Sequence, residues 1–264
     1  NWGMEFALGY NNKFGAFDYE TNVTYSFNRN KVTELLDDYY DSVTNEHYSL
    51  PYFNAGNVRL EKGGTMGDIY TSTDLKRDME GNIMIDENTK NVVREQLATP
   101  RKIGSVLPSG NLGWRNSLSW KGIHLSALLT ARFGGQVVSV TQAIMDEYGV
   151  SKTSADARDA GGIRVNKGVV APEGYYAVVG GRDPITQQYM YDADNVRLQE
   201  LSFGYTIPRK YLFNTVTATV SCVARNLWMI YNKAPYDPEN TASTGTYFQG
   251  YDYFMQPSLR SVGF

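Results

Sequence analysis

Residues 112–133, LGWRNSLSWKGIHLSALLTARF, decide the fold class of this chain of 264 residues. On both sides of Lys121-Gly122, large apolar side chains alternate with polar or small ones. A period of two is typical of β-strands whose faces meet different environments, and Lys-Gly suits a short turn between them. The stretch therefore predicts a hairpin of two long antiparallel strands, each apolar on one face and polar on the other.

The same alternation continues elsewhere, over residues 2–11, 17–28 and 215–225. In residues 195–207 the phase changes, which predicts a β-bulge near Glu200. A last strand is expected from about Tyr253 to Phe264, although Pro257 interrupts it. Strands of about 10 residues exceed the usual ~5–6 residues of globular proteins and match the height of a membrane.

The connections between these seven expected strands are strongly unequal. Short turns follow residues 10, 120 and 207, whereas the long excursions cover residues 30–109, 134–193 and 229–252. Outer-membrane barrels combine short periplasmic turns with long extracellular loops. The sequence therefore predicts an all-β, transmembrane antiparallel barrel segment with three long extracellular loops. Inside these loops, residues 139–148 and 154–158 favour short helical turns, and residues 75–90 favour a hairpin turning at Glu80-Gly81-Asn82.

The composition excludes several classes of protein. Aromatic residues make up 13% of the chain, yet no apolar run reaches the ~20 residues of a membrane-spanning helix. A net charge of -3 disfavours a nucleic-acid partner, and a single cysteine, Cys222, excludes an intrachain disulfide. No signal peptide opens the chain, so we expect it to be a piece of a longer protein.

Catalysis is not expected. The two histidines, His47 and His124, are too far apart to suggest a Ser-His-Asp site or a histidine-rich metal site. We expect no cofactor, with one weak exception. A loop calcium ion is conceivable where oxygen ligands gather around Gly81, but the EF-hand spacing is not met and a plain turn is favoured. These ligands are Asp78, Glu80, Asn82 and Asp86.

Two groups of side chains are candidates for binding. Aromatic loop residues could stack on sugar rings or hold peptide side chains, or equally pack the loops together or against a partner. They are Tyr175, Tyr176, Tyr236, Tyr247, Phe248 and Tyr251. Charged residues on the polar strand faces are expected to face the barrel lumen. They are Glu5, Arg115, Arg132, Arg197 and Arg225. Four tryptophans at expected strand ends suggest an interfacial girdle. They are Trp2, Trp114, Trp120 and Trp228.

Several motifs, in order, resemble those of the SusC/RagA family of TonB-dependent outer-membrane transporters. The most extended is NVRLQELSFGYTIP at residues 195–208, followed by VARNLW at 223–228 and YDPE at 236–239. Upstream, residues 67–70 (GDIY), 132–135 (RFGG) and 148–150 (YGV) are also similar. The resemblance covers nearly the whole chain.

This resemblance implies a barrel of about 22 strands, of which the chain would supply the last seven. The plug domain, the first strands and the TonB box would lie outside this sequence. A SusD-like surface lipoprotein would cap the barrel, and the TonB-ExbB-ExbD complex would drive import of a large oligosaccharide or peptide through the outer membrane. Family members close with an alternating strand, and residues 256–264 look shorter than that strand although they end on Phe264.

The alternative is a secreted, water-soluble β-sandwich that binds carbohydrate. It predicts short strands and connections of similar length at both ends. Strand length and loop asymmetry favour the barrel, while the choice between glycan and peptide as ligand stays open.

Overall fold

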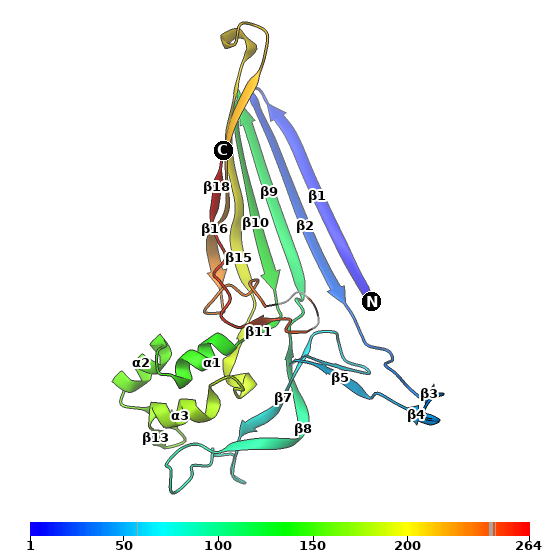
Figure 1. Ribbon diagram of the computed structural model, residues 1–264. Coiled ribbons are helices and arrows are strands. Elements are labelled where there is room, and N and C mark those ends of the chain that lie inside the picture. Colours follow the sequence, from blue (N-terminus) through cyan, green and yellow to red (C-terminus); the bar gives the residue numbers. More distant parts are fainter. Residues whose placement is uncertain (57, 243–244, 246) are drawn as a thin grey trace.

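Seven strands form one antiparallel sheet in the computed structural model, which describes residues 1–56, 58–242, 245 and 247–264. The strands lie side by side in sequence order, so each of the five inner strands pairs with the one before and the one after it in the sheet (Figure 1). They are β1 (Trp2–Phe14), β2 (Phe17–Arg29), β9 (Gly110–Trp120), β10 (Ile123–Phe133), β15 (Asn195–Ile207), β16 (Ala218–Asn232) and β18 (Ser261–Gly263). This tall antiparallel sheet confirms the all-β fold class.

One face of this sheet is apolar and uncovered. The register places Leu8 opposite Val23 and Val23 opposite Trp114, so large apolar side chains from neighbouring strands lie in rows. Leu8 is 75% exposed and Trp2 is 62% exposed. A continuous exposed apolar face is unusual in a water-soluble protein and is typical of the lipid-facing band of membrane barrels. The opposite face carries the polar and small side chains that alternate with these apolar residues along each strand.

The tryptophans lie on this apolar face, but not all at strand ends. Trp2 and Trp120 occupy strand ends, where Trp2 packs edge-on against Phe27 at 5.5 Å and Trp120 stacks on Phe17 at 5.3 Å. Trp114 lies at mid-strand, where its indole Nε1 donates to the Thr21 hydroxyl at 3.0 Å. The prediction that Trp114 belongs to a girdle at the strand ends is therefore wrong.

The bulge expected near Glu200 is present. Leu129 faces Leu198 and Leu128 faces Glu200, so Gln199 is left out of the ladder with β10. The ladder with β16 shifts at the same point. The extra residue resets the alternation, so that Leu198 and Leu201 both reach the apolar face although they are an odd number of residues apart.

The two ends of the sheet differ as the sequence predicts. The β1–β2, β9–β10 and β15–β16 connections meet at one end, and the long excursions extend from the other (Figure 1). Lys121 and Gly122 have φ of 47° and 91°, as a tight hairpin turn requires. We call the second end, which carries residues 30–109, 134–194 and 233–260, the loop end. Residues 57, 243, 244 and 246 of the expected loops lie outside the described ones.

The last strand is shorter than expected. Of residues 253–264, only β18 pairs with β16, with Gly263 opposite Val223 and Ser261 opposite Arg225. Residues 253–260 form no ladder, in part because Pro257 has no N–H to donate. The strand expected from Tyr253 is therefore corrected to Ser261–Gly263.

The first long excursion folds into strands that the sequence analysis largely missed. They are β3 (Tyr39–Asp41), β4 (Glu46–Tyr48), β5 (Tyr52–Ala55), β6 (Val58–Glu61), β7 (Asp68–Leu75) and β8 (Arg94–Ser105). β5 to β8 form a four-stranded sheet. The hairpin expected at Glu80-Gly81-Asn82 is confirmed, because Asp78 N–H donates to the Asn82 carbonyl at 2.9 Å and Gly81 has φ of 85°.

The second excursion is largely helical. It contains β11 (Gln136–Ser139), α1 (Val140–Glu147), α2 (Lys152–Asp159), β12 (Ile163–Val165), β13 (Gly168–Val170), α3 (Pro172–Val179), a 3₁₀ helix (Thr186–Tyr189) and β14 (Met190–Asp192). Both expected helices are confirmed, and the Ser139 hydroxyl caps α1 by accepting from Gln142 N–H at 3.0 Å. Helix α3 was not expected. In the part of the chain that the structure describes, no helix is long and apolar enough to cross a bilayer.

The excursions share apolar cores. Val58, Ile69 and Val106 of the first pack with Val138 and Ile144 of the second, together with Tyr251 of the third. Strand β17 (Tyr251–Asp252) also pairs in parallel with β11. The loop end is therefore one packed unit held against the sheet.

Candidate ligand passage at the loop end of the sheet

Charged side chains meet on the polar face of the sheet. Arg115 of β9 and Arg225 of β16 approach Glu200 of β15 from both sides, with N···O distances of 3.7 Å and 3.1 Å. The register also puts Glu5 on this face, since Glu5 pairs with Ser26 and Ser26 with Asn111. Three of the five residues expected to face a lumen thus share one exposed polar surface.

Arg197 differs from that expectation. It belongs to the same face, but it is only 4% exposed because the chain after β16 folds back over it. Its Nη2 lies 2.5 Å from Asp237 Oδ1 and 3.4 Å from Glu239 Oε2, and its Nη1 donates to Asn226 Oδ1 at 3.0 Å. The expectation that Arg197 faces an open lumen is therefore corrected: this guanidinium anchors a loop.

Arg132 is the fifth candidate, and it is half-buried. Its Nη2 donates to the carbonyl oxygen of Val106 at 2.8 Å. This bond joins β10 to the first long excursion. Arg132 therefore also serves as an anchor, although it still lines a cavity described below.

The carboxyl group of Asp237 is held ionised at its anchor point. Burial alone would raise its pKa, but hydrogen bonds from Arg197 and from the Ser258 hydroxyl, at 2.6 Å, keep the pKa below its usual value. The backbone N–H of Glu239 also donates to Asp237 Oδ1 at 3.1 Å. Asp237 thus joins β15 to both sides of the third excursion.

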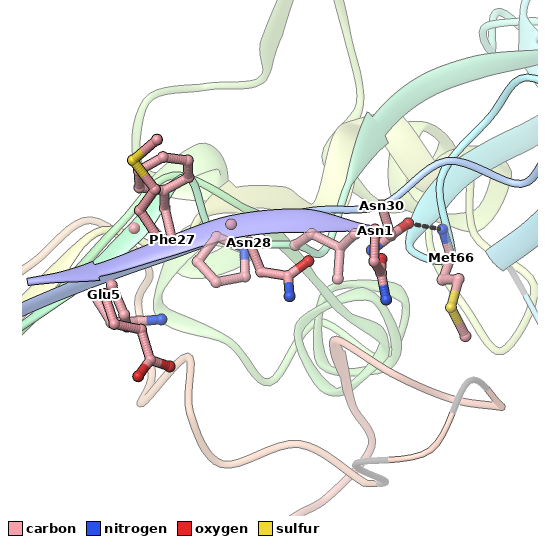
Figure 2. Close-up of a pocket in the computed structure, with 13 residues that line it drawn as sticks. Asn1, Glu5, Phe27, Asn28, Asn30 and Met66 are labelled. Carbon is pink, nitrogen blue, oxygen red and sulfur yellow. Dashed lines mark hydrogen bonds between the residues drawn. The ribbon is translucent and has the colours of Figure 1, made fainter.

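A cavity of about 600 Å³ opens where β1, β2 and β9 meet the first excursion. Figure 2 shows Glu5 on the opposite side of the strand from Phe27, on the polar side of the sheet. The Asn30 side-chain oxygen accepts from Met66 N–H at 2.8 Å, which ties the cavity rim to the excursion. Asn28 and Asn111 add two further amides to its wall.

Two smaller cavities share lining residues with this one. One of about 370 Å³ lies over the polar face and shares Ser26 and Asn111 with the first. Another of about 220 Å³ lies beneath the third excursion and shares Pro108 with the first. Glu239 lines both smaller cavities. Together the three form what we call the passage.

The lining of the passage mixes polar and apolar side chains and is sparsely charged. Among its described side chains only Glu5, Arg132 and Glu239 are charged. Amides and hydroxyls supply most other polar groups, including Gln199, which the bulge in β15 carries to this face. Such a surface can exchange hydrogen bonds with an uncharged polar ligand, because each amide both donates and accepts.

The aromatic candidates divide into two groups. Tyr176 and Tyr251 are 8% and 7% exposed and belong to apolar cores of the loop end. Tyr175 packs edge-on against Tyr176 at 5.5 Å, and burial raises the pKa of both hydroxyls. Tyr236 is half-buried and packs edge-on against Tyr191 at 6.3 Å. These four rings contact other loop residues, which agrees with the loop-packing alternative that the sequence left open. A ligand-stacking role for them stays a prediction.

Tyr247 and Phe248 remain open to solvent. They are 55% and 47% exposed, and their ring centroids lie 4.6 Å apart. Neither lines the passage as described. A ligand-stacking role for this pair stays a prediction.

The carboxylates of the acidic hairpin accept hydrogen bonds from backbone N–H groups of its own turns. Asp78 Oδ1 accepts from the N–H groups of Glu80 and Asn82, both at 2.9 Å, and Asp86 Oδ1 accepts from Thr89 N–H at 2.7 Å. Hydrogen bonds from Asn82 and Thr89 lower the pKa values of Asp78 and Asp86, respectively. Within the described ranges no group of three or more His, Cys, Asp or Glu side chains is arranged to hold a metal ion.

Sequence reasoning missed Asp237, Glu239, Gln199 and the asparagines of the passage as functional candidates. For Asp237 and Glu239 the signal was present in the YDPE motif at residues 236–239. That motif pointed to a family but did not show which carboxylate is buried and which is exposed. Only the fold shows that Asp237 and Glu239 both lie beside Arg197.

Comparison with known proteins gives a consistent result. No family model matches the sequence. The chain is 26% identical to TonB-dependent receptor P3 and 24% identical to TonB-dependent receptor P26, both of Formosa agariphila, over 99% of its own length. It spans 28% of the length of each receptor.

Solved structures agree on the fold. The RagAB peptide importer in its open-open state matches with a TM-score of 0.64 over 98% of this chain and 27% of the other, at 18% identity. A structure of the RagAB peptide transporter matches with a TM-score of 0.57 over 89% of this chain and 25% of the other, at 17% identity. The resemblance that the motifs indicate is thus confirmed: the chain is similar over nearly its whole length to part of a TonB-dependent receptor, and its sheet has the fold of part of such a receptor's barrel.

Proposed function

We propose that the chain forms part of the wall and the outer loops of an outer-membrane receptor that imports a large polar nutrient with energy delivered through TonB. One observation carries this proposal: a tall sheet with an exposed apolar face and a polar face that leads into a hollow at the loop end. The names of the similar receptors support it. The role is transport rather than catalysis.

The two faces of the sheet suit such a role. The apolar rows that contain Leu8, Val23 and Trp114 would contact outer-membrane lipids. The polar face, with Glu200 between Arg115 and Arg225, would border the lumen and contact the plug domain. The loop end would then face the cell exterior, with the short turns in the periplasm.

The proposal also includes two partners. A SusD-like surface lipoprotein would cover the loop end and close the passage over a bound ligand. The TonB-ExbB-ExbD complex would act through parts of the receptor outside this chain. The similar RagAB structures are described as a peptide importer and a peptide transporter, which favours a peptide as the ligand.

The lining of the passage is compatible with a peptide ligand. Sugar rings are commonly held by stacking on aromatic faces. Among the described lining residues no tyrosine or tryptophan occurs, and Phe27 points away from the polar side (Figure 2). Amides such as Asn28, Asn111 and Gln199 instead match the paired donor and acceptor of a peptide bond.

The soluble β-sandwich is the second candidate, and the exposed apolar face speaks against it. In a sandwich a second sheet packs over that face at about 10 Å. In the described structure the other sheets are short and lie at the loop end (Figure 1). Large side chains such as Leu8 and Phe6 stay 75% and 56% exposed.

The direct test is to express the complete parent reading frame in a Gram-negative host and fractionate the envelope. We expect the protein in the outer membrane, co-purifying with a lipoprotein encoded beside it, and peptide uptake that disappears when TonB is deleted. A product that folds in water without detergent would overturn the proposal and favour the carbohydrate-binding sandwich.

A further inference from the structure

The connection between β15 and β16 differs from the other two short turns. It covers residues 208–217 and extends past both of them at that end of the sheet (Figure 1). It opens with a short 3₁₀ helix, Arg209–Tyr211, in which Tyr211 N–H donates to the Pro208 carbonyl at 3.0 Å. A second hydrogen bond, from Leu212 N–H to the Arg209 carbonyl at 2.8 Å, closes this helix. The connection is therefore a folded element, which we call the tip.

The tip exposes aromatic rings. Phe213 is 96% exposed and Tyr211 is 66% exposed. Phe213 has φ of 55°, in the left-handed region that side chains with a Cβ rarely adopt. Val216 and Val220, 55% and 61% exposed, follow in the chain, and Val220 pairs with Tyr205 in a row of the apolar face. Exposed apolar side chains thus run from the apolar face of the sheet onto the tip.

Three exposed cations accompany these rings. They are Lys121, Arg209 and Lys210. Lys210 Nζ lies 4.7 Å from the ring centroid of Tyr211, and Lys121 Nζ lies 5.2 Å from that of Trp120. The β9–β10 turn adjoins the tip, because Thr206 N–H donates to the Gly122 carbonyl at 2.7 Å. Aromatic rings beside long cationic side chains are typical of membrane interfaces, where the ring stays near the acyl chains and the charge reaches the headgroups.

Carboxylates do not balance these charges. Residues 96–145 and 201–236 contain no Asp or Glu. At the same end of the sheet, Asp18 of β2 pairs with Lys13 at 3.3 Å. None of the three cations takes part in an ion pair between residues that the structure describes. The tip and its neighbouring turn therefore present an excess of positive charge beside exposed rings.

We propose that the tip, together with Lys121, is an interfacial anchor that binds the phosphate groups of anionic phospholipids. This inference rests on the proposed function, which puts the short turns at the periplasmic leaflet. Tyr211 and Phe213 insert where the headgroups meet the acyl chains, and the three cations meet the phosphates. A lipid surface is the occupant that fits, because its charge complements the tip and the apolar surface of the tip runs on from the face assigned to lipid.

The test measures lipid contact at the tip itself. Thr215, which is exposed in the tip, is replaced by cysteine in a full-length receptor that lacks other cysteines, and a fluorophore is attached. The receptor is reconstituted in phosphatidylcholine vesicles that contain a small fraction of nitroxide-labelled phosphatidylglycerol or of nitroxide-labelled phosphatidylcholine. We expect both lipids to quench this fluorophore more than one at Lys167→Cys, an exposed position of the loop end. Because each cation near a lipid surface attracts anionic lipid, the phosphatidylglycerol should quench about three- to tenfold more effectively.

Two variants separate the contributions of charge and of aromatic rings. Arg209→Gln with Lys210→Gln should bring the quenching by the two lipids to within about twofold, and raising the salt from about 0.1 M to about 0.5 M should act in the same direction. Phe213→Ser should reduce the quenching by both lipids, because the tip inserts less deeply.

The matched control for the charge variant is Arg164→Gln with Lys167→Gln. It removes one arginine and one lysine from exposed positions of the loop end, so it changes the net charge equally. The quenching ratio at position 215 should stay at its wild-type value in this control.

The outcomes distinguish the anchor from the proposed function. A receptor that enters the vesicles but shows equal quenching by the two lipids, or a ratio unchanged by Arg209→Gln with Lys210→Gln, would overturn the anchor and leave import intact. Quenching by neither lipid, with crosslinking of a photoreactive group at position 215 to a periplasmic protein in intact cells, would replace the lipid by a protein partner. A chain that folds in water without detergent would instead overturn the proposed function.

Discussion

The guanidinium of Arg197 and the carboxylate of Asp237 meet at 2.5 Å across 40 residues of sequence, with 5% and 12% of their side chains exposed. Arg197 belongs to a strand whose alternation points it toward the polar side of the sheet. Asp237 arrives from the excursion that follows β16. The contact makes that excursion a cover over the passage instead of a free loop.

Removing one partner of this pair should be more costly than removing both. Arg197→Met leaves the Asp237 carboxylate buried without its cation, which we expect to cost about 3–5 kcal/mol. The double variant with Asp237→Leu removes the stranded charge as well and should be less destabilised than the single variant. Thermal unfolding of the full-length receptor measures both, and a double variant at least as unstable as Arg197→Met would contradict the account.

The third excursion should lose stability in acid, when the Asp237 carboxylate becomes protonated. The pKa of Asp237 is lower in the folded protein than in the unfolded chain, so its stabilising contribution is present above the unfolded value of about 4 and is lost as pH falls through the folded value. Hydrogen exchange of residues 233–242, corrected for the intrinsic rate, should stay constant from about pH 7 to pH 5. Protection that already falls near pH 6 would show that another group controls the cover.

The short turns offer a matched pair of glycines. Gly122 has φ of 91°, and a Cβ there would lie 2.8 Å from the Thr206 carbonyl oxygen, whereas Gly15 has φ of 65° and open space around it. Gly15→Ala should cost about 1 kcal/mol from the backbone alone, and Gly122→Ala more, because the neighbouring strand must also move. Comparable melting temperatures for the two variants would contradict this difference.

If the apolar face contacts lipid, a charged residue should destabilise the protein more on that face than on the polar face. Leu8→Arg introduces a charge at mid-strand on the apolar face, which should cost about 2–4 kcal/mol of folding into a bilayer. Asn22→Arg is the control, since Asn22 pairs with Gly9 on the polar face, where a charge meets water. The readout is folding into vesicles followed by urea titration. Equal losses for both variants would show that the two faces do not differ in environment.

Parts of the fold that depend on a local sequence pattern could be predicted, whereas parts that depend on distant contacts could not. The strands could be predicted because Leu8, Val23 and Trp114 alternate with polar residues, and a sheet between two environments requires that alternation. The bulge at Gln199 followed from the same rule, because the phase of alternation changes there.

The loop end could not be predicted in the same way. Val58, Ile69, Val138 and Tyr251 form one core from three separate excursions, so no local period marks them. Tyr176 and Tyr251 were candidates for ligand binding, because the sequence of a loop does not show whether its aromatic side chains are buried or exposed. Glu239 was missed since its placement depends on Arg197, which lies far away in the sequence.

If the sheet separates lipid from an aqueous passage, single cysteines on its two faces should differ in their accessibility to a water-soluble reagent. In the full-length receptor with Cys222→Ser, single cysteines would replace Val23 on the apolar face and Thr24 on the polar face, and intact outer membranes would be treated with a membrane-impermeant maleimide small enough to enter the lumen. We expect labelling at position 24 and little at position 23. Labelling of both positions, or of position 23 alone, would contradict this expectation.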